Sequence, residues 1–416
     1  MINIHEAANA MIKSIIADNM PQKAVTTALA AREFTGNKLH LIAIGKAAWT
    51  MAKAASGFLG NKINTGIVIT KYGHSGGDIP RVKIYEAGHP IPDGNTVAAT
   101  SAVLALAEGL SQDDEVIFLV SGGGSALFEA PQEGISLEDL AALTNALLAS
   151  GADIVEVNTI RKRLSKVKAG RFAALVSPAR IFQVVLSDVL GDRLDTIASG
   201  PAAPDASTSE DALAIAEKYG LKLSTQQMKH LRRETPKTAA NVETVITGSV
   251  GSLCEAAAAS AKALGFTPYI LTTSLNCQAA EAGKFLAAIA RDTQRGVTHF
   301  TRPCAIIAGG ETVVKITGNG LGGRNQEMAL SAAAGIAGLE NTLILAIGSD
   351  GTDGPTDAAG GIVDGGTMAK LAAHGIDIEK TLANNDSYRA LKAADGLIIT
   401  GPTGTNVNDV AVILCM

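Results

Sequence analysis

Several glycine-rich stretches of this sequence follow apolar, strand-like runs, and they carry most of the side chains that could do chemistry. The polar side chains in these stretches are Lys46, Ser121, Ser125, Asp188, Glu311, Arg324, Asp350 and Asp353. Exposed backbone N–H groups can approach an anion, lysine and arginine can neutralise it, and carboxylates can hold Mg²⁺. This set suits phosphoryl transfer, in which catalysis consists mainly of positioning and charge stabilisation.

The longest of these stretches, residues 313–330, begins with a β-branched run and continues through Gly-Asn-Gly-Leu-Gly-Gly into Arg324 and an alanine-rich helical pattern. We expect a strand, a loop whose backbone approaches phosphate groups, and a helix N-terminus directed at the same anion. The residues predicted to bind nucleotide or substrate here are Gly320, Gly322, Gly323 and Asn325.

The same glycines also satisfy the pattern GxGxxG, which is typical of dinucleotide-binding loops. The alternative function is therefore an NAD(P)H-dependent reductase of a small keto acid such as hydroxypyruvate. Arg324 stands directly at the helix entrance, and no acidic residue is cleanly placed for a ribose hydroxyl. Both details favour phosphoryl transfer.

A second glycine-rich turn, Ser-Gly-Gly-Gly-Ser at residues 121–125, follows the apolar run 115–120. Three consecutive glycines give a concave backbone surface suited to a phosphate or carboxylate. The residues predicted to bind substrate or nucleotide in this turn are Ser121, Gly122, Gly123, Gly124 and Ser125. The lysine of a Walker A loop and the final glycine of a hydrolase nucleophile elbow are both missing, which excludes those two motifs.

Aspartates follow two further strand-like runs, where open α/β sheets place their ligands. Asp188 and Asp192 come after residues 182–186, and Asp350 and Asp353 come after residues 342–347. We interpret Asp188 as a catalytic candidate that could accept the proton of the reacting hydroxyl. Asp192, Asp350 and Asp353 are the candidate Mg²⁺ ligands, and helix capping is the alternative role for Asp188 and Asp192.

Six cations lie within eleven positions of a helical segment: Arg161, Lys162, Arg163, Lys166, Lys168 and Arg171. A solvated helix face is the simplest interpretation, and a surface that attracts anionic substrates is the alternative. His89 lies among prolines and glycines, so we expect a hydrogen-bonded loop residue there rather than a substrate contact.

Length and composition predict an α/β protein of two domains. The chain has 416 residues, 47% of them hydrophobic, 4% aromatic, and 44 of them glycine, which suits alternating strands and helices joined by tight turns. The polar segment 222–241 is the expected junction, giving domains 1–235 and 236–416. In the second domain, residues 305–308 and 312–317 are expected to form a hairpin around Gly309-Gly310-Glu311.

Charge and hydropathy argue against several classes of partner. A formal net charge of −5 and few aromatic residues give no attraction to nucleic acid. No run reaches the roughly 18 apolar residues of a membrane span, and the first twenty residues lack the pattern of a signal peptide. The four cysteines are scattered without metal-ligand spacing. We therefore expect a cytoplasmic protein, for which a homodimer is compatible with the sequence.

Six motifs, taken together and in order, resemble the glycerate 2-kinase family, the class II glycerate kinases with a C-terminal MOFRL domain. They are SGGGSAL (121–127), LSDVLGD with IASGP (186–201), GGET (309–312), GGRNQE (322–327), GSDGTDGPTDAAGG (348–361) and GPTGTNVND (401–409). The likeness extends from about Gly45 to the C-terminus. Some members of this family carry the name hydroxypyruvate reductase, so the name alone does not dismiss the alternative function.

The resemblance implies an ATP- and Mg²⁺-dependent transfer of a phosphoryl group to the 2-hydroxyl of D-glycerate, giving 2-phosphoglycerate. It also implies a Rossmann-like α/β/α N-terminal domain, a mixed α/β C-terminal domain and an active site in the cleft between them. The key lysine of the family falls on Lys46 and its key arginine on Arg324. We therefore predict that Lys46, Arg324 and Asp188 are catalytic and that Glu311 contacts substrate or nucleotide.

Overall fold

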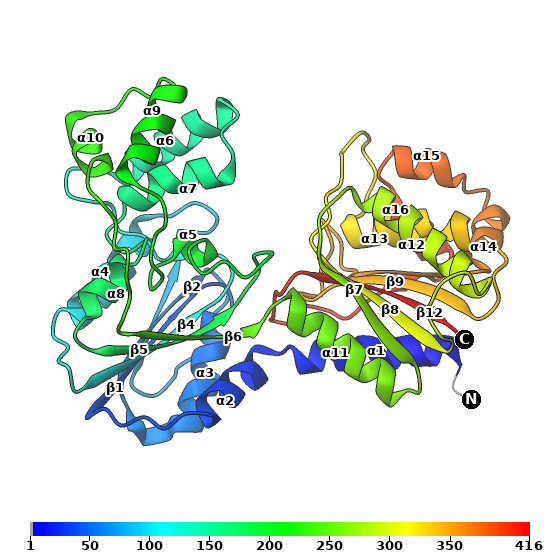
Figure 1. Cartoon of the computed structure of the whole chain (residues 1–416), viewed down its shortest axis with the longest axis horizontal. Coiled ribbons are helices and arrows are strands. Elements are labelled where there is room, and N and C mark those ends of the chain that lie inside the picture. The colour runs from blue at the N-terminus through cyan, green and yellow to red at the C-terminus, as the bar shows by residue number, and fades with distance from the viewer. Residues whose placement is uncertain (1–2) are drawn as a thin grey trace. The chain divides into compact units, whose positions relative to one another are not determined.

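The computed structural model describes residues 3–416, which fold into two compact units (Figure 1). Residues 24–247 form one unit, and residues 248–416 form the other together with the N-terminal residues up to Lys23. The division after Thr247 lies about a dozen residues beyond the junction expected from the sequence. Helix α1 (Ile4–Asp18) packs against α11 (Val250–Ala263) and thus belongs with the C-terminal half.

The unit of residues 24–247 is built on a sheet with the order β3-β2-β1-β4-β5-β6, and the described pairings from β3 to β5 are parallel. Its strands are β1 (Lys38–Ile44), β2 (Ile63–Lys71), β3 (Val82–Ala87), β4 (Asp114–Val120), β5 (Arg180–Leu186) and β6 (Val242–Gly248). The chain builds outward from β1 to β3 and then returns to place β4 on the other side of β1. Strand order therefore reverses between β1 and β4, the position at which doubly wound sheets bind ligands.

Both faces of this sheet are covered, which explains the continuous apolar runs of its central strands. Along β4, Val116 and Phe118 face one hydrophobic cluster and Ile117 and Leu119 face another. The helical segments of the unit are α3 (Ala48–Leu59), η1 (Gly60–Lys62), α4 (Gly94–Ala107), α5 (Gly124–Leu127), α6 (Leu137–Ala149), α7 (Ile154–Arg163), α8 (Arg171–Val176), η2 (Ile197–Ser199), α9 (Ser209–Lys218) and α10 (Thr225–Leu231). Helices α6, α7, α9 and α10 gather in a separate helical cluster (Figure 1). Helix α2 (Pro21–Ala30) crosses the boundary between the units.

The second unit has a mixed sheet with the order β11-β10-β9-β12-β8-β7. Its strands are β7 (Thr267–Leu275), β8 (Cys304–Gly310), β9 (Thr342–Gly348), β10 (Gly360–Asp364), β11 (Leu397–Ile398) and β12 (Asp409–Cys415). Its other helical segments are α12 (Ala279–Gln294), α13 (Arg324–Ala333), η3 (Ala334–Ile336), α14 (Thr367–Ala373), α15 (Ile378–Ala383) and α16 (Ser387–Ala393). Figure 1 shows α12, α13 and α16 on one face of the sheet and α1 and α11 on the other.

The hairpin expected around Gly309-Gly310-Glu311 is wrong. Strand β8 pairs with β7 on one edge and with β12 on the other. Since both edges of β8 are occupied, residues 312–317 cannot pair with it, and they run on as a loop with a single bridge between Val313 and Gln278. The strand expected to lead into the glycine-rich loop is therefore absent.

Among residues 3–416, no helix combines the length and the apolar character needed to cross a membrane.

Close approach of strands makes Gly360 a sensitive position. A methyl group there would lie 1.9 Å from the carbonyl oxygen of Ala346 on the paired strand β9. We expect Gly360→Ala to lower the free energy of unfolding by about 2 kcal/mol or more, because backbone atoms must shift. Thermal unfolding of the purified variant measures this.

The matched control is Gly57→Ala in α3, where no atom lies within 4 Å of the new methyl group. It should be neutral or stabilising, since alanine favours a helix over glycine. Equal melting temperatures for the two variants would contradict the packing argument.

Candidate active-site residues

The loops that follow β1 and β4 interlock where the strand order reverses. The amide of Lys46 donates to the carbonyl oxygen of Gly122 (2.8 Å), and the amide of Ala47 donates to Oγ of Ser121 (3.1 Å). Gly45 has φ +113°, and a Cβ there would lie 2.3 Å from Ser121 Oγ. Glycine is thus required at this crossing, and the crossing places the lysine beside the triple glycine.

Lys46 and Asp188 both flank Gly122. A methyl group at Gly122 would lie 2.3 Å from Oδ2 of Asp188 and 3.6 Å from Cε of Lys46. Gly123 adopts φ +81°, the left-handed conformation that helps to form a concave backbone nest. The structure therefore brings together one carboxylate, one ammonium group and the bare glycine backbone, as the sequence predicted.

The nest formed by Gly122–Gly124 also lies next to His89, which the sequence did not favour as a substrate contact. A methyl group at Gly123 would lie 2.8 Å from Nε2 of His89, so the imidazole lies against the nest. Burial lowers the pKa of His89, and the charges of Lys46, Lys71 and His74 lower it further. His89 is therefore neutral at pH 7 and able to offer one N–H group to a ligand.

A second segment, residues 197–200, packs against the nest. Oγ of Ser125 and Oγ of Ser199 are 2.8 Å apart, and a methyl group at Gly124 would meet Cβ of Ala198 at 2.9 Å. Ala198 and Ser199 both have positive φ (50° and 61°), an uncommon conformation for residues with side chains that costs on the order of 1 kcal/mol or more each. Asp192, on the same connection, also has positive φ (52°) and is half-buried.

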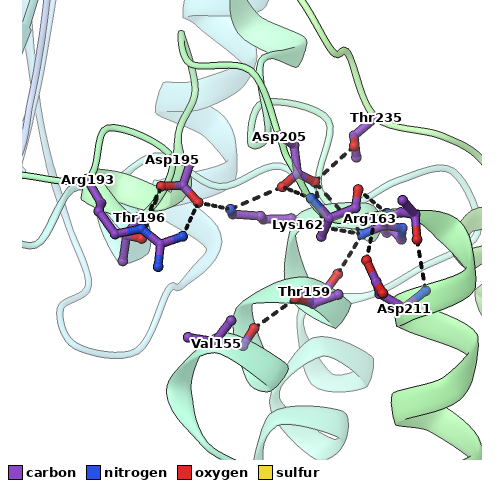
Figure 2. Close-up of polar contacts among 12 residues, drawn as sticks. Val155, Thr159, Lys162, Arg163, Arg193, Asp195, Thr196, Asp205, Asp211 and Thr235 are labelled. Carbon is purple, nitrogen blue, oxygen red and sulfur yellow. Dashed lines mark hydrogen bonds and ion pairs between the residues drawn. The ribbon is translucent and has the colours of Figure 1, made fainter.

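The expectation of a solvated helix face at residues 161–171 is wrong, because of its six cations only Lys166 is exposed. Figure 2 shows Lys162 between two carboxylates: its Nζ lies 3.3 Å from Asp205 and 3.6 Å from Asp195. Arg163 is fully buried and donates to the hydroxyl and the carbonyl group of Ser207 (2.9 Å each). The carboxylate partners lie more than thirty positions away, so the local charge pattern could not reveal them.

In the other unit, Arg324 opens helix α13 and is held by two carboxylates. Its Nε and Nη2 form a fork with Asp409 at 2.5 and 3.1 Å, and Nη1 donates to Glu311 at 2.9 Å. Nδ2 of Asn408 donates to the second oxygen of Glu311 (3.0 Å). A bidentate arginine–carboxylate pair is rigid, so the guanidinium is positioned before any ligand arrives.

The electrostatics of this pair are set mainly by burial. Burial raises the pKa of the Asp409 carboxyl to about 6, against the attraction of Arg324 and with the support of the nearby charge of Asp353. Burial acts to lower the pKa of Arg324, but the hydrogen bonds and charge of Asp409 and the charge of Glu311 outweigh it and raise that pKa. Arg324 therefore keeps its positive charge throughout the physiological range.

Asp353 already occupies the start of helix α13. Its carboxylate accepts the amides of Asn325 (3.1 Å) and Gln326 (2.8 Å) together with both of their side-chain NH₂ groups (3.3 and 3.0 Å). A carboxylate is stabilised at a helix N-terminus, and this one is 3% exposed. This geometry favours the capping role for Asp353, whereas a metal-binding role for it stays a prediction.

The glycine-rich loop of this unit is held by residues 384–386. The amides of Gly318, Asn319 and Gly320 donate to groups of Asn384 and Asn385, and the amide of Leu321 donates to Asp386. These four amides are thus unavailable to a ligand. Among the described residues, the amides of Gly322, Gly323 and Arg324 have no acceptor, so these three amides of the segment remain free to donate to a ligand.

These free amides border a cavity of about 640 Å³ within the same unit. The predicted residues that line it are Gly320, Gly322, Gly323, Arg324, Asp350 and Asp353. Asp350 accepts the amide of Thr352 through Oδ1 (3.0 Å). Glu327 also lines the cavity, and its burial raises the pKa of its carboxyl group. Glu311 and Asn325 lie beside the cavity as partners of Arg324 and Asp353.

The structure around the loop does not match that of a dinucleotide-binding loop. Such a loop joins a strand to a helix within a βαβ unit, but no strand precedes Gly318. The glycines have a local reason: a methyl group at Gly318, Gly320 or Gly323 would come within 2.4 Å of Asn384 or Asp353. The GxGxxG match therefore reflects close packing of this loop.

Two family models match separate parts of the chain. Residues 7–232 match the model of a domain of unknown function, DUF4147, and residues 304–409 match the model of the MOFRL family. A D-glycerate 2-kinase from Thermotoga maritima is 53% identical over 410 residues, covering 99% of this chain and 98% of that protein. The chain belongs to the glycerate 2-kinase family. The predicted family and fold class, two α/β units with the MOFRL part C-terminal, are confirmed.

Three further comparisons describe how this glycerate 2-kinase family member relates to others. The crystal structure of the glycerate kinase from T. maritima covers 99% of both chains with a TM-score of 0.97 and 54% identity. A glycerate 2-kinase from Pyrococcus horikoshii is 46% identical over 91% of this chain and 87% of its own. A relative from Agrobacterium vitis, 40% identical over 90% of this chain and 98% of its own, is provisionally named a hydroxypyruvate reductase.

The Arg324–Asp409 pair predicts a dependence of stability on pH. The pKa of Asp409 in the folded protein, about 6, lies above the ordinary carboxyl value of 3.8. The folded protein therefore binds this proton more tightly than the unfolded chain, and stability from this group rises as pH falls from about 7 toward 4, by up to about 3 kcal/mol.

Melting temperatures of the parent protein and of Asp409→Asn at about pH 5 and about pH 7.5 measure this contribution. The variant should lack the gain that the parent shows at the lower pH, because asparagine has no carboxyl group to protonate. An identical pH response in the two proteins would contradict the raised pKa.

Proposed function

We propose that this protein transfers the γ-phosphoryl group of ATP to the 2-hydroxyl of D-glycerate, giving 2-phosphoglycerate and ADP. The observation that carries the proposal is the meeting of Lys46, Asp188 and the Gly122–Gly124 nest at the strand-order reversal. A glycine nest binds an anionic oxygen group, an ammonium neutralises transferred charge, and a carboxylate accepts a hydroxyl proton. The relatives named D-glycerate 2-kinase and glycerate 2-kinase suggest the substrate.

Each residue takes a role that its chemistry allows. Lys46 stabilises charge on the transferring phosphoryl group, and the nest with Ser121 and Ser125 holds the glycerate carboxylate or a phosphate. Asp188 accepts the proton of the attacking hydroxyl. Arg324, fixed by Asp409 and Glu311, neutralises charge on a phosphate group bound in its own unit, and the amides of Gly322 and Gly323 bind phosphate oxygens there.

Mg²⁺ is part of the proposal through the chemistry of ATP. When bound, it neutralises the charge that develops on the β- and γ-phosphate oxygens. Among residues 3–416, no cluster of three or more metal-ligating side chains occurs. That fits Mg²⁺, which is usually held by one or two carboxylates together with substrate phosphates. Asp350, which lines the cavity, and Asp192, four residues after Asp188 in the sequence, would supply such carboxylates. A cytoplasmic location stays a prediction.

Purified protein with D-glycerate, ATP and Mg²⁺ should form ADP, which a coupled assay detects. Lys46→Met should lower kcat/KM by a hundredfold or more, the cost of about 3–4 kcal/mol typical for a charge that acts in the transition state. Lys53→Met, on the exposed side of α3, is the control and should leave activity unchanged. Oxidation of NADH with hydroxypyruvate, without ADP formation, would support the reductase instead.

Arg324 is tested by a substitution that keeps its charge. Arg324→Lys retains one positive group but loses the fork with Asp409, so we expect the activity to fall by about tenfold to a hundredfold. Circular dichroism and the melting temperature should show that the protein still folds. Parent-level activity in a folded Arg324→Lys protein would refute the role of the guanidinium geometry.

A further inference from the structure

A buried ion pair lies next to α5, the helical turn that continues from the Gly122–Gly124 nest. It takes no part in the proposed chemistry. Nζ of Lys168 lies 3.0 Å from Oε2 of Glu129, and the two side chains are 0% and 1% exposed. Replacing a buried ion pair with neutral groups of similar volume often costs nothing or increases stability. A role other than stability is therefore a reasonable explanation for this pair.

The ammonium group of Lys168 is bonded to the backbone that carries the nest. It donates to the carbonyl oxygens of Ser125 (2.6 Å) and Phe128 (3.2 Å), and Glu129 accepts its third bond. Ser125 belongs to the single helical turn α5, and Phe128 ends it. Since α5 begins at Gly124, a shift of this turn would move the glycines that face the ligand.

The two residues after Lys168 hold the neighbouring loop at the same time. The amide of Ala169 donates to Ser199 O (3.0 Å), and the amide of Gly170 donates to Gly200 O (2.7 Å). Ser199 in turn contacts Ser125 through their hydroxyl groups. Residues 168–170 thus connect the nest and the 197–200 loop into one hydrogen-bonded assembly.

The preceding helix anchors this assembly. Lys162, on α7, bonds to Asp195 on the same connection as the 197–200 loop, and to Asp205 further along (Figure 2). The basic segment 161–171 is therefore an internal framework rather than a surface that attracts substrate.

We infer that Lys168 is a positioning residue, which fixes the Gly122–Gly124 nest in the geometry that binds the anionic group of a substrate. The inference rests on the proposed function for its kinetic consequence. Lys168 itself touches no reacting group. It acts through the carbonyl groups of Ser125 and Phe128, so its loss should weaken recognition of the substrate whose anion occupies the nest.

The test removes both charges, because Lys168→Met alone would leave Glu129 buried and unpaired. In the double variant Lys168→Met/Glu129→Gln, we expect KM for one substrate, D-glycerate or ATP, to rise by about tenfold or more, with KM for the other nearly unchanged. Amides of residues 126–128 should exchange with deuterium about tenfold faster than in the parent protein. A general loss of stability would not produce a rise confined to one substrate.

Arg163→Met is the matched control, since Arg163 lies in the same buried segment but bonds to Thr159 and Ser207 and pairs with Asp205 and Glu234 rather than with either loop. It should lower the melting temperature while leaving both KM values and the exchange of residues 126–128 as in the parent. If the double variant does not fold, Glu129→Gln alone replaces it. That variant keeps the bonds to Ser125 and Phe128 and should retain parent-level KM values.

Parent-level KM values and exchange in the folded double variant would overturn the inference, as would a single-substrate KM rise in Glu129→Gln. A parent protein that forms no ADP would instead refute the proposed function. The exchange measurement needs no activity and would still decide whether Lys168 holds the nest.

Discussion

The crossing of two backbones at the strand-order reversal is the constraint on which the unit of residues 24–247 depends. The amide of Lys46 meets the carbonyl of Gly122, and Gly45 passes so close to Ser121 that no side chain fits. These contacts fix where the lysine and the triple glycine lie, and Asp188 and His89 lie against the glycines. Chemistry here thus follows from how β1 and β4 are joined.

In the MOFRL-containing unit, the candidate anion-binding groups lie at the start of helix α13. Helix α13 offers its N-terminus to an anion, but the carboxylate of Asp353 already occupies it. What remains for a ligand is the guanidinium of Arg324, oriented by Asp409 and Glu311, and the amides just before it. Several glycines of this loop are needed because neighbouring residues pack closely against its backbone. This packing explains why the sequence also fits the dinucleotide pattern.

Regular elements and strand-end residues could be predicted from the sequence because their signals are local. Buried strands such as β4 are apolar runs, and the loops after them contain the glycines and charges. Most of the failures involve partners distant in the chain. The hairpin at 305–317 failed because β12, a hundred residues later, occupies the edge of β8. Strand β10, with two glycines at its start, lacked a strand-like pattern.

Side-chain partners escaped prediction for the same reason. Asp409 was not identified as the partner of Arg324, although it ends a recognised motif, because 85 positions separate the two residues. The buried cations at 162, 163 and 168 looked like a solvated face, since their carboxylate partners lie elsewhere in the chain. His89 was interpreted as a loop residue, and only the fold places its ring on the nest.

The most direct measurement is phosphorus NMR of the purified protein incubated with D-glycerate, ATP and Mg²⁺. We expect the ATP signals to decline while those of ADP and 2-phosphoglycerate grow together. Unchanged ATP, or a product phosphorylated at the 3-hydroxyl, would contradict the assignment of this chain as a glycerate 2-kinase.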